Sequence, residues 1–240
     1  MDVEPITVHA PPLPGRSSAS QRWSELAFLH WRVDPNDVAP LLPPGIRPDE
    51  FDGSSWVGLI AFALDRATLL GSPPIPYFGT FVEVNVRLYG VDAAGRRGVV
   101  FASLEASRLA AVLAARGLFS LPYYWSKTTM ERPAGHLRYS SRRHGQASAR
   151  STIEIGIGAQ IAVPDPLSDF LTSRWGLFVK RGHRTVRLRN WHEPWLLHDA
   201  ELVGLDDSLI AAAGLAQVTS NPPDSVLYSP GVTTRFGPAA

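Results

Sequence analysis

The segment FVEVNVRLY, residues 81–89, has the clearest strand pattern in the chain. Side chains of a β-strand point alternately to opposite faces, and here one face is aliphatic while the other is mainly polar. The polar face carries a carboxylate, an amide and a guanidinium about 7 Å apart, contributed by Glu83, Asn85 and Arg87. Such a face meets solvent on an open sheet and lines a pocket on a curled one. The segment therefore predicts a strand, but it does not decide whether the polar face meets solvent or lines a pocket.

Strands are predicted on either side of this segment, and the predicted helices are short. The strand-like stretches are residues 23–33, 46–51, 56–65, 98–104, 130–143, 148–158, 184–191 and 196–205, and the helix-like ones are 36–42, 105–118, 165–175 and 207–213. No repeat or linker interrupts residues 21–240, so we expect one α+β domain that is β-rich and largely antiparallel. The proline-rich residues 1–20 predict a poorly ordered arm.

Composition excludes several classes of protein and site. The 240 residues are 45% hydrophobic and 19% charged, as in globular proteins, and a net charge of +1 argues against nucleic-acid binding. The absence of cysteine excludes disulfides, thiolate metal sites and a cysteine nucleophile. The start of the chain lacks a secretory signal, and the apolar residues 109–125 are interrupted by Arg116 and Pro122. We expect a cytoplasmic protein without membrane contact, and homo-oligomerisation stays open.

No motif for a metal or a cofactor stands out. The seven histidines lack metal-ligand spacing, Gly156-x-Gly158 is a weak match to a phosphate loop, and no Gly-x-Ser-x-Gly motif is present. We therefore expect no metal, no cofactor, and a small molecule as the partner.

A second candidate region is RGLFSLPYYWSK, residues 116–127. A helix is predicted to end at Gly117, and Pro122 directs the chain into an extended path through Tyr123 and Tyr124. Aromatic clusters belong to the core more often than to a site, so composition alone favours a structural role here.

A series of short motifs covers nearly the whole chain after the N-terminal arm. They are HWRVDP at 30–35, LLPPG at 41–45, FDG at 51–53, WVGL at 56–59, E-x-N-V-R-x-Y at 83–89, GV-x-F-x-SL at 98–104, AR-x-x-F-x-LPY at 115–123, H-x-x-W at 192–195 and YSPGV at 228–232. In this order they resemble the uncharacterised YqjF-like family, domain of unknown function 2071. That family is similar in turn to acetoacetate decarboxylase, which implies a β-cone, a curled sheet around a central pocket.

The resemblance also implies where a site lies. The active-site glutamate of the decarboxylases falls on Glu83, and their lysine pair falls on Tyr123 and Tyr124. The Schiff-base lysine and the neighbour that lowers its pKa are therefore both missing. Lys127, three to four residues further, would lie about 10 Å away in a strand. Decarboxylation through an imine is not expected.

These residues lead us to expect a small-molecule enzyme without a Schiff base. Its acid–base chemistry would act on a carbonyl or carboxylate compound, in a lyase, dehydratase, isomerase or cyclase type of reaction. Glu83 is the expected acid or base. Tyr123 and Tyr124 are the expected phenol donors, but adjacent strand positions allow only one of them to face the pocket, and we favour Tyr123.

The expected substrate-binding residues are Asn85, Arg87, Arg116 and Lys127. Arg87, with Arg116 as a second candidate, would hold an anionic or carbonyl oxygen. The alternative is a non-catalytic protein that binds a small ligand in the same pocket. A third hypothesis, imine chemistry at Lys127, requires its amine to enter that pocket.

Overall fold

The computed structural model describes residues 2–69, 71–73 and 79–239, and its main element is a sheet of 12 strands. The strands are β1 (Ala19–Val33), β2 (Ile46–Pro48), β3 (Ser55–Leu69), β4 (Phe81–Asp92), β5 (Arg97–Ala106), β6 (Tyr123–Glu131), β7 (Leu137–Arg143), β8 (Arg150–Gln160), β9 (Gly176–Arg181), β10 (Arg184–Trp191), β11 (His198–Asp207) and β12 (Ser225–Ala239). The α-helices are α1 (Pro35–Val38), α2 (Leu109–Phe119), α3 (Pro166–Thr172) and α4 (Leu209–Ala212). This confirms the predicted β-rich, largely antiparallel α+β class. None of the described helices is long and apolar enough to cross a membrane.

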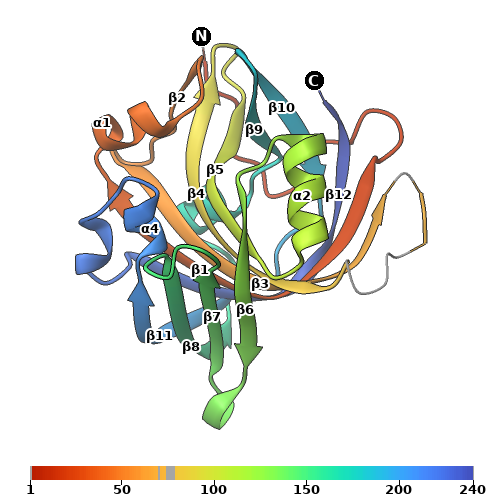
Figure 1. Ribbon diagram of the computed structural model, residues 1–240. Helices are drawn as coiled ribbons and strands as arrows, with labels where there is room; N and C mark the ends of the chain where they lie inside the picture. The colour runs from red at the N-terminus through yellow and green to blue at the C-terminus, as the bar shows by residue number, and fades with distance from the viewer. Residues whose placement is uncertain (1, 70, 74–78, 240) are drawn as a thin grey trace.

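The sheet closes on itself in two circuits (Figure 1). The first circuit runs through β5, β4, β3, β1, β12, β10 and β9, closed by the pairings of β10 with β12 and of β9 with β5. The second returns from β12 to β5 through β11, β8, β7 and β6. Figure 1 shows the first circuit as the upper bowl, with α2 across it, and the second as the lower part. Strands β1, β3 and β4 lie between the two circuits. One face of each strand is turned towards the interior of the first circuit, and the other face towards the interior of the second.

Strand β4 shows this division residue by residue. Val84 and Val86 are fully buried in the core of the second circuit, together with Tyr139 of β7 and Ile153 of β8. The alternate residues, Glu83 among them, point into the first circuit, whose core includes Phe28, Ile60 and Leu177. The polar face is therefore enclosed, because curling of the sheet turns it away from solvent.

Local signals position the helix starts and one hairpin as the sequence predicts. Asp34 caps α1 by accepting a 2.8 Å hydrogen bond from a backbone N–H, with Pro35 at the first helical position. Asp165 caps α3 in the same way at 2.7 Å. Asp52-Gly53 turns the chain with φ angles of 51° and 73°, a left-handed pair that suits a two-residue hairpin.

Several predicted boundaries were wrong. The helix predicted from residue 105 begins at Leu109, because Glu105 still belongs to β5, where its carboxylate pairs with Arg143. The strand predicted over residues 130–143 is a hairpin of β6 and β7 with a turn over Pro133–Gly135. Strands β9 and β12 were not predicted; β12 contains Pro230-Gly231, a pair that normally argues against a strand.

The arm before β1 contains no helix or strand over residues 2–18. The N–H of Glu4 donates to the Gly95 carbonyl at 2.9 Å, and its carboxylate accepts from the Arg97 N–H at 2.7 Å. The Trp175 indole N–H donates to the Thr7 carbonyl at 2.9 Å. The arm thus contacts the domain near β5 and β9 before the first strand begins.

Candidate functional site

Glu83 is a buried carboxyl group whose two oxygens both accept hydrogen bonds. Its exposure is 2%. The Tyr123 hydroxyl donates to Oε2 at 2.7 Å, and the Asn85 amide donates to Oε1 at 3.1 Å. Burial raises the pKa of Glu83 from 4.5 to about 7; the two hydrogen bonds oppose this shift and Glu105 adds to it. Glu83 can therefore take up or release a proton near neutral pH.

The end of α2 places Tyr123. The helix continues past the predicted end at Gly117 to Phe119, where Ser120 adopts a left-handed φ of 56° and its N–H donates to a carbonyl of the last turn. After Pro122, β6 pairs with β5 in parallel, with Tyr123 opposite Leu104. The next strand in this register is β4, so the tyrosine reaches the strand that carries Glu83.

Tyr123 stays a neutral phenol under ordinary conditions. Burial raises its pKa well above 10, and the neighbouring Glu83 carboxylate raises it further. The hydroxyl can therefore pass a proton on, but it does not hold a negative charge.

Tyr124 points the other way, as alternation along a strand requires. Its ring lies 3.5 Å from the Arg143 guanidinium carbon and 5.5 Å from that of Arg116. Arg143 in turn donates to the fully buried Glu105 at 2.5 Å. Only Tyr123 therefore contacts Glu83, and Tyr124 covers a separate ion pair.

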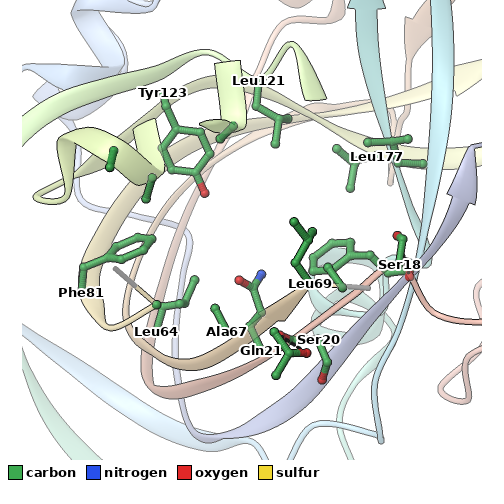
Figure 2. Close-up of a pocket in the computed structure, with 18 of the residues that line it drawn as sticks. Ser18, Ser20, Gln21, Leu64, Ala67, Leu69, Phe81, Leu121, Tyr123 and Leu177 are labelled. Atoms are coloured by element: carbon green, nitrogen blue, oxygen red, sulfur yellow. Dashed lines mark hydrogen bonds between the residues drawn. The ribbon is translucent and has the colours of Figure 1, made fainter. Parts of the chain in front are cut away.

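The first circuit contains a pocket of about 410 Å³ that is partly open to solvent, and Tyr123 forms part of its wall. Figure 2 shows the Tyr123 hydroxyl pointing into the pocket and the Gln21 amide pointing in from the opposite side. Among the described side chains of helix α2, those that line the wall are small: Ala110, Ala111 and Ala115. No charged residue is among the described residues that line the pocket, and its polar side chains are those of Ser18, Ser20, Gln21, Thr68 and Tyr123.

The other predicted site residues lie outside this wall. Asn85 is buried behind Tyr123 with Glu83. Arg87 is partly buried, with its guanidinium carbon 5.6 Å from the Phe28 ring, and its Nε and Nη2 have no hydrogen-bond partner among the described residues. Arg116 and Lys127 are exposed and do not line the pocket. The structure thus joins Glu83, Asn85 and Tyr123 by hydrogen bonds. The three predicted cations contact neither this group nor the pocket in any hydrogen bond among the described residues.

Sequence patterns did not indicate two buried polar clusters of the first circuit. His30 Nε2 lies 2.7 Å from the Tyr89 hydroxyl, which donates to the Leu171 carbonyl at 3.0 Å. Burial, with Arg87 nearby, lowers the pKa of His30 well below 6.5, so the ring is neutral and donates from Nε2. The second cluster joins Asp49 to Arg97 and Arg174.

The sequence also contained no indication of Gln21, because a lone glutamine just before the strand predicted at residues 23–33 has the pattern of any surface residue. In the structure it lies within β1. The small-residue face of α2 left a signal that could have been used. That signal is the alanine content itself, because small side chains leave room beside a helix. In the structure Leu109 and Leu113 are exposed, Val112 is buried, and Ala110, Ala111 and Ala115 line the pocket.

Metal binding finds no support in the described part of the chain. Within it, no three or more side chains of His, Asp or Glu form a group that could hold a metal ion.

Comparison with known proteins identifies the family. Residues 20–233 match the domain of unknown function 2071 (DUF2071), described as "Uncharacterized conserved protein". The chain belongs to this family. The uncharacterized protein YqjF of Bacillus subtilis (strain 168) is 31% identical over 204 residues, 84% of each chain. This confirms the resemblance that the sequence motifs indicated.

Solved structures show that this DUF2071 member has the acetoacetate decarboxylase-like fold. The acetoacetate decarboxylase of Legionella pneumophila aligns with a TM-score of 0.64 over 95% of this chain and 89% of that chain, at 15% identity. The enduracididine biosynthesis enzyme MppR, solved with pyruvate, aligns with a TM-score of 0.64 over 94% of this chain and 90% of that chain, at 14% identity. At these identities the likeness concerns the fold alone.

No lysine is among the described residues that line the pocket of this DUF2071 member. The resemblance to acetoacetate decarboxylase places tyrosines at the lysine pair, and the exposed Lys127 does not line the pocket. Incubation with pyruvate or acetoacetate and borohydride is therefore expected to leave the intact mass unchanged, because no neutral amine meets the substrate. A reduced adduct that peptide mapping assigns to Lys127 would contradict this prediction.

Proposed function

We propose that this DUF2071 member is an enzyme that transfers a proton next to the carbonyl group of a small molecule. The proposal rests on one observation: a carboxyl group with a pKa of about 7 is joined by a 2.7 Å hydrogen bond to a tyrosine whose hydroxyl points into the pocket. Proton transfer of this kind begins isomerisations, dehydrations and ring closures, so the proposal covers that group of reactions.

The proton path consists of two oxygens. With Glu83 ionised, the Tyr123 oxygen takes a proton from the carbon next to the carbonyl as its own proton passes to Glu83 Oε2, and the electron pair of the broken C–H bond stays on the substrate as its enolate. With Glu83 protonated, the same chain runs in reverse and delivers a proton to the substrate. Tyr123 remains neutral in both cases, since its pKa lies well above 10. Asn85 acts as a positioning residue, because its amide holds the other carboxyl oxygen of Glu83.

A screen for proton exchange tests this function without knowledge of the substrate. Neutral ketones and aldehydes are incubated with the protein in D₂O, and loss of the α-proton signal is followed by NMR. We expect at least one compound to exchange faster than in buffer. The proposal fails if no carbonyl compound of a broad panel exchanges, or if the Glu83→Gln variant exchanges as fast as the wild type.

Phenylalanine variants of the two tyrosines are a matched pair. Tyr123→Phe removes the oxygen that takes the proton from the substrate, so exchange is expected to fall by about 100-fold or more, the usual contribution of a positioned acid or base. Tyr124→Phe keeps the ring on Arg143 and is expected to leave exchange unchanged. Equal rates in both variants would place the proton path elsewhere.

A second candidate function is non-catalytic binding of the same class of ligand. Both oxygens of Glu83 already have internal partners, in Tyr123 and Asn85, which is also what a purely structural polar group requires. Under this alternative, ligands bind in the pocket and no α-proton exchanges.

A further inference from the structure

We propose that the pocket selects a neutral, largely apolar molecule with one oxygen at Tyr123 and a second polar group at Gln21. The inference rests on the proposed function, since it names the substrate class of the same site. It differs from a pocket for small keto acids, which would need a cation beside the carboxylate.

The size and the lining of the pocket favour an apolar molecule. A volume of about 410 Å³ lies in the range of pockets that hold drug-sized ligands and exceeds what a three- or four-carbon acid fills. Most of the wall is aliphatic or aromatic, with the larger side chains from Leu64, Phe81, Leu121, Leu177, Leu188 and Phe236. Contact with these groups stabilises a bound molecule in proportion to the apolar area it buries.

The pocket offers no partner to an anion. None of the described residues that line it is charged, and the residues outside the description, at positions 1, 70, 74–78 and 240, include no Lys, Arg or His. Arg87 lies on the same face of β4 as Glu83, and its Nε and Nη2 have no partner among the described residues, but it does not line the pocket. Arg174 does not line the pocket either, and Asp49 engages it at 2.5 Å. A carboxylate bound against this wall would lose part of its hydration without a compensating charge, which disfavours its binding. Ionised Glu83, one residue behind the wall, would repel it further.

Three polar side chains remain for the ligand: Tyr123 on one side of the pocket, and Gln21 and Ser20 on the other (Figure 2). Ser18 and Thr68 already donate to backbone carbonyls, at 3.1 Å to Phe236 and 3.4 Å to Ser20. The Gln21 amide and the Ser20 hydroxyl have no hydrogen-bond partner among the described residues, and the larger Gln21 side chain points into the pocket. It offers a donor and an acceptor at the side opposite Tyr123. Gln21 is therefore the specificity residue of this inference.

Two probes of nearly equal shape test the charge preference. In 4-phenyl-2-butanone a methyl group stands where 3-phenylpropanoate has its second carboxylate oxygen, so the two differ mainly in charge. Isothermal calorimetry with the wild-type protein is done at pH 6, where Glu83 is protonated and can donate to Tyr123, which frees the Tyr123 hydroxyl to donate to the ketone oxygen. We expect the ketone to bind about 100-fold more tightly or better, given the cost of burying an unpaired ion. Equal affinities, tighter binding of the carboxylate, or binding of neither probe would overturn the inference.

A positive charge introduced at Gln21 tests whether this residue contacts the bound ligand. Gln21→Arg places a guanidinium inside the pocket and is expected to improve binding of 3-phenylpropanoate by about tenfold or more relative to the ketone. The control is Gln160→Arg, which adds the same charge at an exposed position of β8 and is expected to change neither affinity. Thermal unfolding of each variant verifies that it is folded. If folded Gln21→Arg keeps the wild-type preference, Gln21 does not contact the ligand.

The outcomes separate this inference from the proposed function. Selective binding of the ketone without any α-proton exchange would support the proposed ligand class and contradict the proposed enzymatic function. Exchange confined to carboxylate-bearing ketones, with no binding of the neutral probe, would support the proposed enzymatic function and contradict the proposed ligand class.

Discussion

Replacing Glu83 by glutamine is expected to abolish α-proton exchange and to make the protein more stable above neutral pH. Glutamine keeps the shape and can hydrogen-bond with Tyr123, but it cannot take up a proton. We expect exchange to fall by about 100-fold or more, the usual contribution of a positioned acid or base. In the wild type, exchange that uses ionised Glu83 as the base should rise with pH and level off above about 7, the pKa of this carboxyl group. NMR rates between pH 5 and 9 measure both effects.

The stability effect follows from the same raised pKa. A carboxyl group whose pKa is raised on folding, here from 4.5 to about 7, stabilises the folded state below its unfolded pKa and loses that contribution as pH rises through the folded value. At pH 8 the wild type holds a buried negative charge, at a cost of about 3 kcal/mol from 1.36 kcal/mol per pKa unit. Glu83→Gln removes this cost, so urea unfolding should show it to be more stable than the wild type at pH 8 and nearly equal at pH 4.5.

Asn85→Asp is a second test of the buried charge, because it adds another carboxyl group beside Glu83 and should raise the pKa of the pair further.

A Glu83→Gln variant that is no more stable than the wild type at pH 8, and that exchanges at the wild-type rate, would contradict both the buried charge and its role.

Replacing Asp49 by asparagine is expected to cause the largest loss of stability. Asp49 is buried and pairs with two arginines, Arg97 and the buried Arg174, which it contacts at 2.5 Å. Arg174 also stacks on Phe170, with its guanidinium carbon 4.2 Å from the ring centre, so it cannot easily move to water. Removing the only carboxylate of this cluster leaves a buried cation without its counterion, which costs about 3–5 kcal/mol. Urea unfolding at pH 7 measures the loss.

An exposed ion pair supplies the control for this variant. Arg150 and Asp206 lie 3.2 Å apart, but their side chains are 53% and 62% exposed. Asp206→Asn makes the same chemical change and is expected to cost less than about 1 kcal/mol, because solvent screens the pair. Similar losses for the two variants would show that burial of the Asp49 cluster does not govern its contribution.

Alternation in the sequence determined much of the local structure of the site. The pattern of residues 81–89 predicted a strand with one polar face, and the strand β4 carries Glu83 and Asn85 on that face. Adjacent tyrosines after Pro122 predicted that only one would face the pocket, and Tyr123 is the one that contacts Glu83. These predictions succeed because side-chain direction in a strand depends only on neighbouring residues. The absence of a lysine pair is likewise a property of the sequence.

Tertiary structure alone decided the chemistry of those side chains. Tyr123 and Glu83 are 40 residues apart in the chain, and Asp49 and Arg174 are 125 apart, so no local pattern reveals either contact. The same alternation that placed Glu83 also placed Arg87 on the polar face, but only the closed circuit decides which of them lies next to the pocket wall. A raised pKa, an uncharged wall and a compensated buried arginine all depend on desolvation and on partners from distant strands, and these exist only once the sheet has closed.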